Sequence, residues 1–185
     1  AHLPERIEKV KRAIVAAYYS PAQHYFCGDI QGASCLALQI GLGDKEVEKR
    51  MKEKFDIGRD GDMTLITSGG QQGIELACKA LCNEGDVVLC EDPTFIGALN
   101  AFRSCGAKTV GLPVGEDGID ADELDRKLSE IKNVKIVYLI PTFQNPGGFT
   151  TSLEKRKAIY NVCAKHGIMI IEDNPYGELR FAGEE

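Results

Sequence analysis

Three loops rich in glycine and proline carry the residues whose types and spacing could support chemistry. The first is TSGGQQG at residues 67–73, which follows an apolar stretch and precedes a helical pattern. Backbone N–H groups at a helix N-terminus, beside glycines that permit close approach, can bind a phosphate group. Glycine in such a turn can equally serve tight packing alone. Gly70 and Gln71 are therefore candidate phosphate ligands, with a purely structural turn as the alternative.

The same turn also imitates part of a dinucleotide-binding fingerprint. Gly70 and Gly73 stand in a GGxxG pattern, and Glu91 follows near the end of the next apolar stretch. An acid about 20 residues beyond such a turn binds the ribose in many NAD-dependent enzymes. At this point a nicotinamide cofactor is a rival interpretation of the glycine-rich turn.

Two proline-bearing loops follow later apolar stretches, PTFQNPGG at residues 141–148 and EDNPYGELRF at residues 172–181. Pro146 biases the residue before it, Asn145, toward an extended backbone, and this restricts where the amide can point. Asp173 comes directly after the apolar run IMIIE, so its carboxylate is expected at the rim of a sheet beside apolar side chains. Taken singly, both residues also fit ordinary turn formers.

A regular alternation of short apolar runs and amphipathic helical patterns must position these loops. The apolar runs lie at residues 63–67, 86–91, 107–112, 134–140 and 168–172, and the helical patterns lie at 71–83, 95–105, 120–131 and 152–166. Buried strands without polar alternation, separated by helices, predict an α/β fold with a mostly parallel sheet and helices on both faces. Ligands bind such sheets at the carboxyl ends of the strands, which is where the three loops fall.

Length, charge and cysteine content narrow the class of protein. The 185 residues are enough for one large domain, predicted at residues 44–185, preceded by a helix and a long connecting loop at residues 1–43. The net charge of -6 disfavours binding to nucleic acid or to an anionic membrane. Neither a membrane span nor an apolar signal segment is visible. The seven cysteines contain no CxxC pair, which favours buried reduced thiols, no metal site and a cytoplasmic location.

Four segments taken together resemble one enzyme family. SGGQQG, EDPTF, IPTFQNPGG and EDNPYGELRF, in this order and spacing, resemble the fold-type I pyridoxal-phosphate aminotransferases of class I and II. The most similar group contains the 2-aminoadipate and kynurenine aminotransferases and the effector domains of MocR-type regulators. The resemblance runs from about LQIGLGDKEV to the end of the chain. The NPGG and EDNPY segments have no role in a dinucleotide enzyme, so they favour pyridoxal 5'-phosphate over a nicotinamide cofactor.

The resemblance implies a function, a partner and a set of site residues. The function is transfer of an amino group between an L-amino acid and a 2-oxo acid, in a homodimer. Asp173 would hydrogen-bond the pyridine nitrogen and keep it protonated. Asn145 and Tyr176 would donate hydrogen bonds to the phenolate oxygen of the ring, and Phe95 would stack on its face. Asp173 and Tyr176 are the predicted catalytic residues.

Three positions depart from the pattern of the family. Gly70 stands where relatives usually have a serine, so a hydroxyl bond to the phosphate is lost, although backbone N–H groups of Gly70 and Gln71 would still bind it. Phe95 replaces a tyrosine and keeps the ring without its hydroxyl. Ile40, in LQIG, replaces a tyrosine that reaches the phosphate of the neighbouring subunit. Each change is expected to weaken cofactor retention.

The family attaches its cofactor as a Schiff base to a lysine in an S-x-x-K segment, and this lysine also moves the proton. That lysine would follow the EDNPY strand and is absent from these 185 residues. Lys155, Lys157 and Lys165 fall on the polar face of the helical pattern at 152–166, as solvated charges do. We therefore expect the chain to correspond to the first part of an aminotransferase large domain and to be inactive by itself.

Two other functions stay open on the same fold, a cofactor-sensing regulatory domain without catalysis and a carbon–sulfur lyase or decarboxylase. In the family, two late strands stand between the apolar runs at 168–172 and 63–67. We therefore expect the run at 63–67 to lack its usual partners and the run at 168–172 to have an open edge.

Overall fold

The computed structural model describes residues 49, 53, 67–176, 182 and 183. Helices and strands alternate along the main described segment. In chain order they are α5 Gly70–Leu81, β1 Val87–Asp92, α6 Ile96–Ser104, β2 Lys108–Gly115, β3 Gly118–Ile119, α7 Ala121–Glu130, β4 Val134–Leu139, α8 Leu153–His166 and β5 Met169–Glu172. None of the helices in this part of the chain is long and apolar enough to cross a membrane.

The five strands form one sheet in the order β3-β2-β1-β4-β5. β1 pairs in parallel with both β2 and β4, and β4 pairs in parallel with β5. This arrangement confirms the predicted α/β fold with a mostly parallel sheet. Four of the predicted apolar runs correspond to β1, β2, β4 and β5, with ends that differ by at most three residues.

The short strand β3 was not predicted. It pairs antiparallel with β2, with Val114 opposite Ile119. Gly118 has a φ of 111°, and a Cβ at this position would lie 2.9 Å from Thr151 Oγ1, so glycine is required there. A strand of two residues has no periodicity that a sequence pattern could reveal.

Two predictions concern residues that are not described. Residues 63–66, most of the predicted first strand, lie outside the described part of the chain, and Thr67 belongs to no strand. The predicted segment at 1–43 lies outside it as well. The five cysteines within the described part have free thiols, of which Cys78, Cys90 and Cys163 are buried and Cys82 and Cys105 are partly buried.

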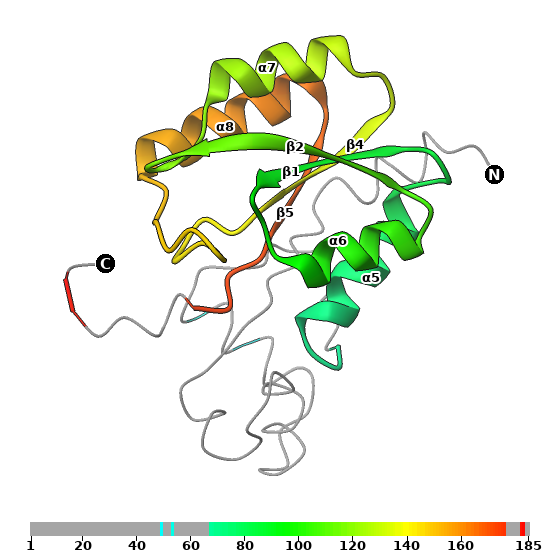
Figure 1. Ribbon diagram of the computed structural model, residues 1–185, viewed down its shortest axis with the longest axis horizontal. Coiled ribbons are helices and arrows are strands. Elements are labelled where there is room, and N and C mark those ends of the chain that lie inside the picture. The colour runs from blue at the N-terminus through cyan, green and yellow to red at the C-terminus, as the bar shows by residue number, and fades with distance from the viewer. Residues whose placement is uncertain (1–48, 50–52, 54–66, 177–181, 184–185) are drawn as a thin grey trace.

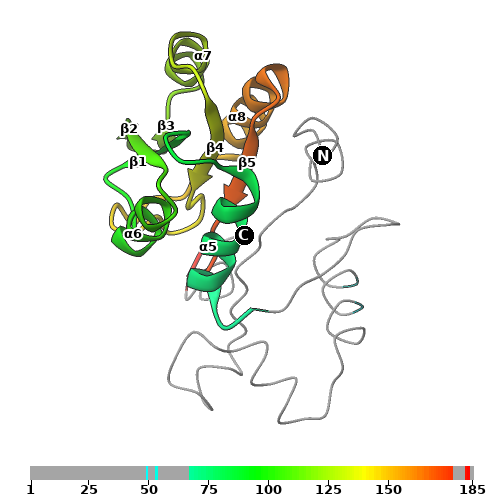
Figure 2. The same cartoon turned by 90° about the vertical axis from the view of Figure 1, so that its right-hand side faces the viewer.

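The sheet has a hydrophobic core on each face, because side chains point alternately to the two sides along a strand. On β1, Val88 and Cys90 cluster with residues of α5 and α6. Val87 and Leu89 instead cluster with residues of α7 and α8. Figure 1 and Figure 2 accordingly show α7 and α8 together on one side of the sheet and α5 and α6 on the other. Helices therefore cover both faces, as the sequence predicts.

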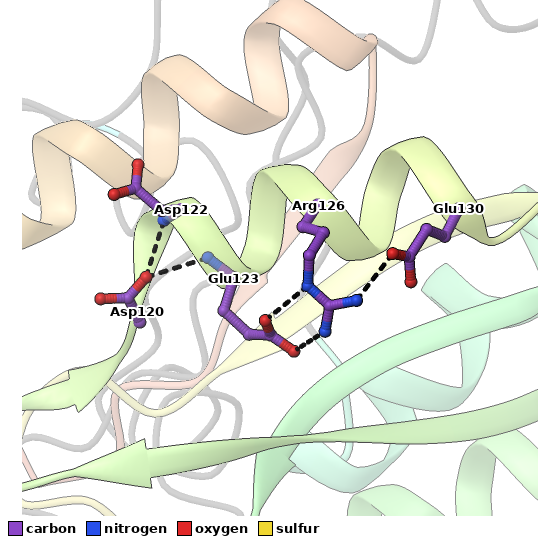
Figure 3. Close-up of polar contacts among 5 residues, drawn as sticks. All are labelled: Asp120, Asp122, Glu123, Arg126 and Glu130. Atoms are coloured by element: carbon purple, nitrogen blue, oxygen red, sulfur yellow. Dashed lines mark hydrogen bonds and ion pairs between the residues drawn. The ribbon is translucent and has the colours of Figure 1, made fainter.

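Side-chain hydrogen bonds define where α7 begins. Oδ1 of Asp120 accepts from the backbone N–H groups of Asp122 and Glu123, each at 2.9 Å (Figure 3). Along the exposed face of the helix, Arg126 donates to Glu123 and to Glu130, with shortest distances of 2.6 Å. An aspartate cap and acidic residues in the first turn both complement the positive end of the helix dipole.

The two ends of α8 also match their sequence signals. The Ser152 hydroxyl accepts from Lys155 N at 3.3 Å, and Gly167 ends the helix in the left-handed conformation with a φ of 68°. Lys155 forms an ion pair with Asp117, and Lys165 forms one with Asp125.

Candidate functional site

Asp173 is the first residue after β5, at the carboxyl end of the sheet. Its backbone N–H donates to Leu139 O at 2.9 Å, which continues the ladder between β4 and β5 by one further bond. The side chain is buried, with only 7% of the residue exposed. Since Ile171 packs in the core on the α5–α6 side, Asp173, two residues later, points to that same side.

Tyr138 is the partner of the Asp173 carboxylate, and sequence analysis missed it. Its hydroxyl donates to Asp173 Oδ2 at 2.6 Å. Burial raises the pKa of Asp173, whereas the hydrogen bond from Tyr138 lowers it. Burial and the Asp173 charge also raise the pKa of Tyr138, so the phenol keeps its proton. The available signal was a single tyrosine inside the aliphatic run VKIVYLI.

Asn145 and Tyr176 lie together, although they are 31 positions apart in the chain. Asn145 Nδ2 donates to Tyr176 Oη at 3.3 Å. Because the phenol oxygen accepts this bond, its own hydrogen is left to donate elsewhere. The pair connects the loop after β4 with the loop after β5.

Gln144 holds the loop that carries Asn145 through hydrogen bonds of its side-chain amide. It is a second site residue that the sequence analysis did not identify. It is 1% exposed, and its Nε2 donates to Glu91 Oε2 at 3.1 Å and to Pro93 O at 2.8 Å. Its Oε1 accepts from Gly147 N at 2.6 Å. One amide thus joins the end of β1, the segment leading to α6 and the turn after β4. No pattern in the sequence distinguishes this buried glutamine from an exposed one.

Glu91 has a structural environment that contradicts the dinucleotide interpretation. It is 2% exposed, and its Oε2 accepts from Ile140 N and from Gln144, each at 3.1 Å. It alternates with Cys90, so it points to the α7–α8 side, away from the glycine-rich turn that begins α5. There it lines a cavity of about 430 Å³ together with Arg156 and Glu172. Burial raises the pKa of Glu91 to about 7.

The glycine-rich turn places an uncapped helix N-terminus beside the start of α6. Gly69 precedes α5 with a φ of 84°, and no side chain caps the first turn within the described residues. Gln71 Nε2 donates to Gly97 O at 2.9 Å. A Cβ on Gly97 would lie 2.3 Å from the Phe95 ring and 2.7 Å from Gln71 Oε1, so glycine allows this approach. Phe95 is half-buried against the core of the α5–α6 face.

The chain belongs to the aminotransferase class I and II family, whose model matches residues 33–185. Aromatic-amino-acid aminotransferase 1 of Thermococcus litoralis is 35% identical over 184 residues, which cover 97% of this chain and 42% of that protein. The chain therefore spans less than half the length of this relative.

Solved structures agree with this assignment. Kynurenine aminotransferase from Pyrococcus horikoshii, in complex with PMP, has a TM-score of 0.71 at 28% identity, over 100% of this chain and 51% of that one. LysN, an α-aminoadipate aminotransferase from Thermus thermophilus, was solved with N-(5'-phosphopyridoxyl)-L-leucine. It has a TM-score of 0.60 at 28% identity, over 98% of this chain and 42% of that one. These findings support the predicted cofactor, pyridoxal phosphate.

The residues at the strand ends fit that cofactor. Tyr138 is the one side chain that the described residues place on the Asp173 carboxylate, so Oδ1 is left for a protonated ring nitrogen. Thr94 Oγ1 and Asn174 Oδ1 are buried without a hydrogen-bond partner among the described residues. They adjoin Phe95 and Asp173 in the chain. Because an unsatisfied buried polar atom is costly, a polar ligand at these strand ends would be stabilising.

Proposed function

We propose that the protein containing this chain transfers an amino group between an L-amino acid and a 2-oxo acid with pyridoxal phosphate. The observation that carries the proposal is the buried Asp173 carboxylate at the rim of the sheet, held by Tyr138 and continuous with the β4–β5 ladder. A buried carboxylate with a free oxygen is a suitable acceptor for a pyridinium N–H group. The family assignment supports the same chemistry.

Pyridoxal phosphate, when bound, supplies an electron sink for the negative charge that develops on the substrate carbon. Asp173 would accept the hydrogen bond of the ring nitrogen and hold the proton on that nitrogen. Asn145 Nδ2 and the Tyr176 hydroxyl would donate to the phenolate oxygen of the ring. The Phe95 ring would cover one face of the cofactor and exclude water from it.

The beginning of α5 would bind the phosphate. The backbone N–H groups of Gly70 and Gln71 lie in the first turn of this helix, and the helix dipole favours an anion there. The hydrogen bond from Gln71 to Gly97 would keep this turn close to Phe95, so one contact would set the distance between phosphate and ring subsites.

We also propose a homodimer in the cytoplasm. The free thiols of the described residues support a reducing compartment. The family assignment supports the homodimer, because this family builds its site across a dimer interface. Light scattering of the complete protein tests this, since a monomer at micromolar concentration would contradict the dimer.

The test of the activity uses the complete protein with Asp173→Ala and Asp120→Ala as a matched pair. Asp173→Ala should lower the rate of amino transfer about 100-fold, the scale expected for loss of one charge-stabilising group. It should also weaken the visible absorption of bound cofactor, while the far-ultraviolet circular dichroism stays unchanged. Asp120→Ala removes a carboxylate from the α7–α8 face and should leave both signals intact. A coloured Asp173→Ala protein with full turnover would refute the proposal.

A further inference from the structure

The hydroxyl group of Tyr138 is one of the most enclosed polar groups in the described part of the molecule. Tyr138 has 0% of its surface exposed, and its ring meets Phe102 edge to face at 5.4 Å with an interplanar angle of 73°. An aliphatic side chain would fill such a site without a buried polar atom to satisfy. Packing alone therefore does not explain the hydroxyl group. It donates a hydrogen bond to Asp173 Oδ2 at 2.6 Å.

The register of the sheet brings this hydroxyl to Asp173. Tyr138 lies opposite Ile171 in the β4–β5 pair, and Asp173 follows two residues later on the same face. The backbone of Asp173 is held in turn by its bond to Leu139 O. Without such a bond, the carboxylate group of an aspartate rotates over a broad range of χ2 angles. With Oδ2 held by Tyr138 and the backbone held by β4, the direction of Oδ1 is set.

The same bond influences the charge of Asp173. A carboxylate in apolar surroundings tends to take up a proton, and burial indeed raises the pKa of Asp173. A protonated Asp173 would be a donor and a poor partner for the N–H of a pyridine ring. The phenol donates to the ionised carboxylate and so favours the form that accepts.

We propose that Tyr138 is a positioning residue that keeps Asp173 ionised and its Oδ1 directed to the ring nitrogen of the cofactor. This inference rests on the proposed function. Tyr138 touches neither the cofactor nor the substrate in this account, because it acts through Asp173.

The test compares the complete protein with its Tyr138→Phe variant, each loaded with pyridoxal phosphate labelled with ¹⁵N in the ring. The wild-type ¹⁵N chemical shift should be that of a protonated pyridine nitrogen. In Tyr138→Phe the shift should move toward the unprotonated value, and cofactor affinity should fall about tenfold, at the low end for a hydrogen bond to a charged group. kcat should fall while KM for the amino acid stays close to the wild-type value.

Two control variants separate this role from packing. Tyr160→Phe removes a hydroxyl from an exposed tyrosine of α8 and should leave the ¹⁵N shift unchanged. Phe102→Leu loosens the packing around the Tyr138 ring without removing a hydrogen-bonding group. It should lower stability and leave the nitrogen protonated.

A second form of the experiment avoids any question of folding. Fluorotyrosine in place of Tyr138 keeps the size of the ring and makes the phenol a stronger donor, so Asp173 should stay ionised to a lower pH. The pH at which the ¹⁵N shift begins to change on acidification should therefore fall. An unchanged shift and affinity in Tyr138→Phe, or an unchanged pH dependence of the shift with fluorotyrosine where Tyr138→Phe does not fold, would overturn the inference. Failure of the wild-type protein to bind the cofactor would instead refute the proposed function.

Discussion

The two helical faces of the sheet begin their helices in different ways. On the α7–α8 face, Asp120 and Ser152 cap the helices with side-chain hydrogen bonds. On the α5–α6 face, Gly69 and Phe95 stand at the corresponding positions, and neither provides a side-chain cap. The first turns of α7 and α8 thus have side-chain partners for their N–H groups, whereas the N–H groups at the start of α5 and α6 have none among the described residues.

Capped helices contribute to the stability of the fold, whereas uncapped helices leave N–H groups free to bind a ligand. An uncapped helix N-terminus costs roughly 1 kcal/mol relative to one with a good cap. On the α5–α6 face, Phe95 at the start of α6 carries that cost, Gly69 at the start of α5 costs a few tenths of a kcal/mol, and Asp173 adds a buried carboxylate. These are the features that a bound anion and a polar ring would compensate. The face with unsatisfied groups is therefore the one that we assign to the cofactor.

The largest effect is expected at the connection between the site loops. Gln144→Leu would leave Pro93 O and Gly147 N without their partner and would take one of two hydrogen bonds from Glu91. The free energy of unfolding should fall by about 4 kcal/mol, since several buried groups become unsatisfied at once. Urea unfolding measures this. Arg126→Ala, on the exposed face of α7, is the control and should change the midpoint little. Equal midpoints for the two variants would show that the Gln144 amide does not hold these loops together.

A pH-dependent effect is expected at Glu91. Burial raises its pKa to about 7 from the ordinary 4.5, so the folded state holds the proton more tightly than the unfolded chain. Its contribution to stability is therefore full below pH 4.5 and is lost as the pH rises toward 7. Glu91→Gln removes this titration, and its stability advantage should grow over that range to about 3 kcal/mol. Urea unfolding at several pH values checks this. A difference that is flat with pH would show that Glu91 does not titrate there.

The close approach of α5 and α6 predicts an intermediate effect. Gly97→Ala places a Cβ against the Phe95 ring and the Gln71 amide, so these side chains must move. We expect a loss of about 2 kcal/mol in stability from overpacking, with weaker cofactor binding because Phe95 is displaced. Gly115→Ala is the matched control, since its Cβ would meet Gly118 O at an ordinary 3.5 Å. Equal cofactor affinity in both variants would argue against a stacking role for Phe95.

The smallest effect is expected at the cap of α7. Asp120→Ala removes two hydrogen bonds to backbone N–H groups and should lower stability by about 1 kcal/mol. The dissociation constant of the cofactor, measured by equilibrium dialysis, should not change, because this cap belongs to the opposite face of the sheet. Weaker cofactor binding in this variant would mean that the two faces are coupled.

Much of the fold was predictable because it follows local rules. Apolar runs and helical patterns identified four of the five strands and the four described helices, with small errors at their ends. Asp120, Ser152 and Gly167 mark helix ends in the sequence as they do in the structure. The strand β3 was not predicted, because its pairing with β2, and not its amino-acid composition, makes it a strand.

The candidate site was predictable only in part. The proline-bearing loops named Asn145, Asp173 and Tyr176, but the roles given to them still await experiment. Tyr138 and Gln144 could not be identified, because a hydrogen bond between residues 35 or 53 positions apart leaves no trace in either segment. The same limit made Glu91 look like a ribose-binding acid.

The sequence by itself determined four of the five strands and the four helices of the main described segment, that the sheet is mostly parallel, and that the two proline-bearing loops follow β4 and β5 at its carboxyl edge. These properties depend on hydrophobic periodicity, turn residues and the alternation of strands and helices along the chain. The tertiary structure alone decided which side of the sheet each polar residue faces and which partner it finds. It turned Glu91 toward the α7–α8 side and brought the Tyr138 hydroxyl to Asp173. The physical reason is that the register between strands, together with burial, sets the hydrogen-bond partners and charge of a side chain, and both are properties of the packed molecule.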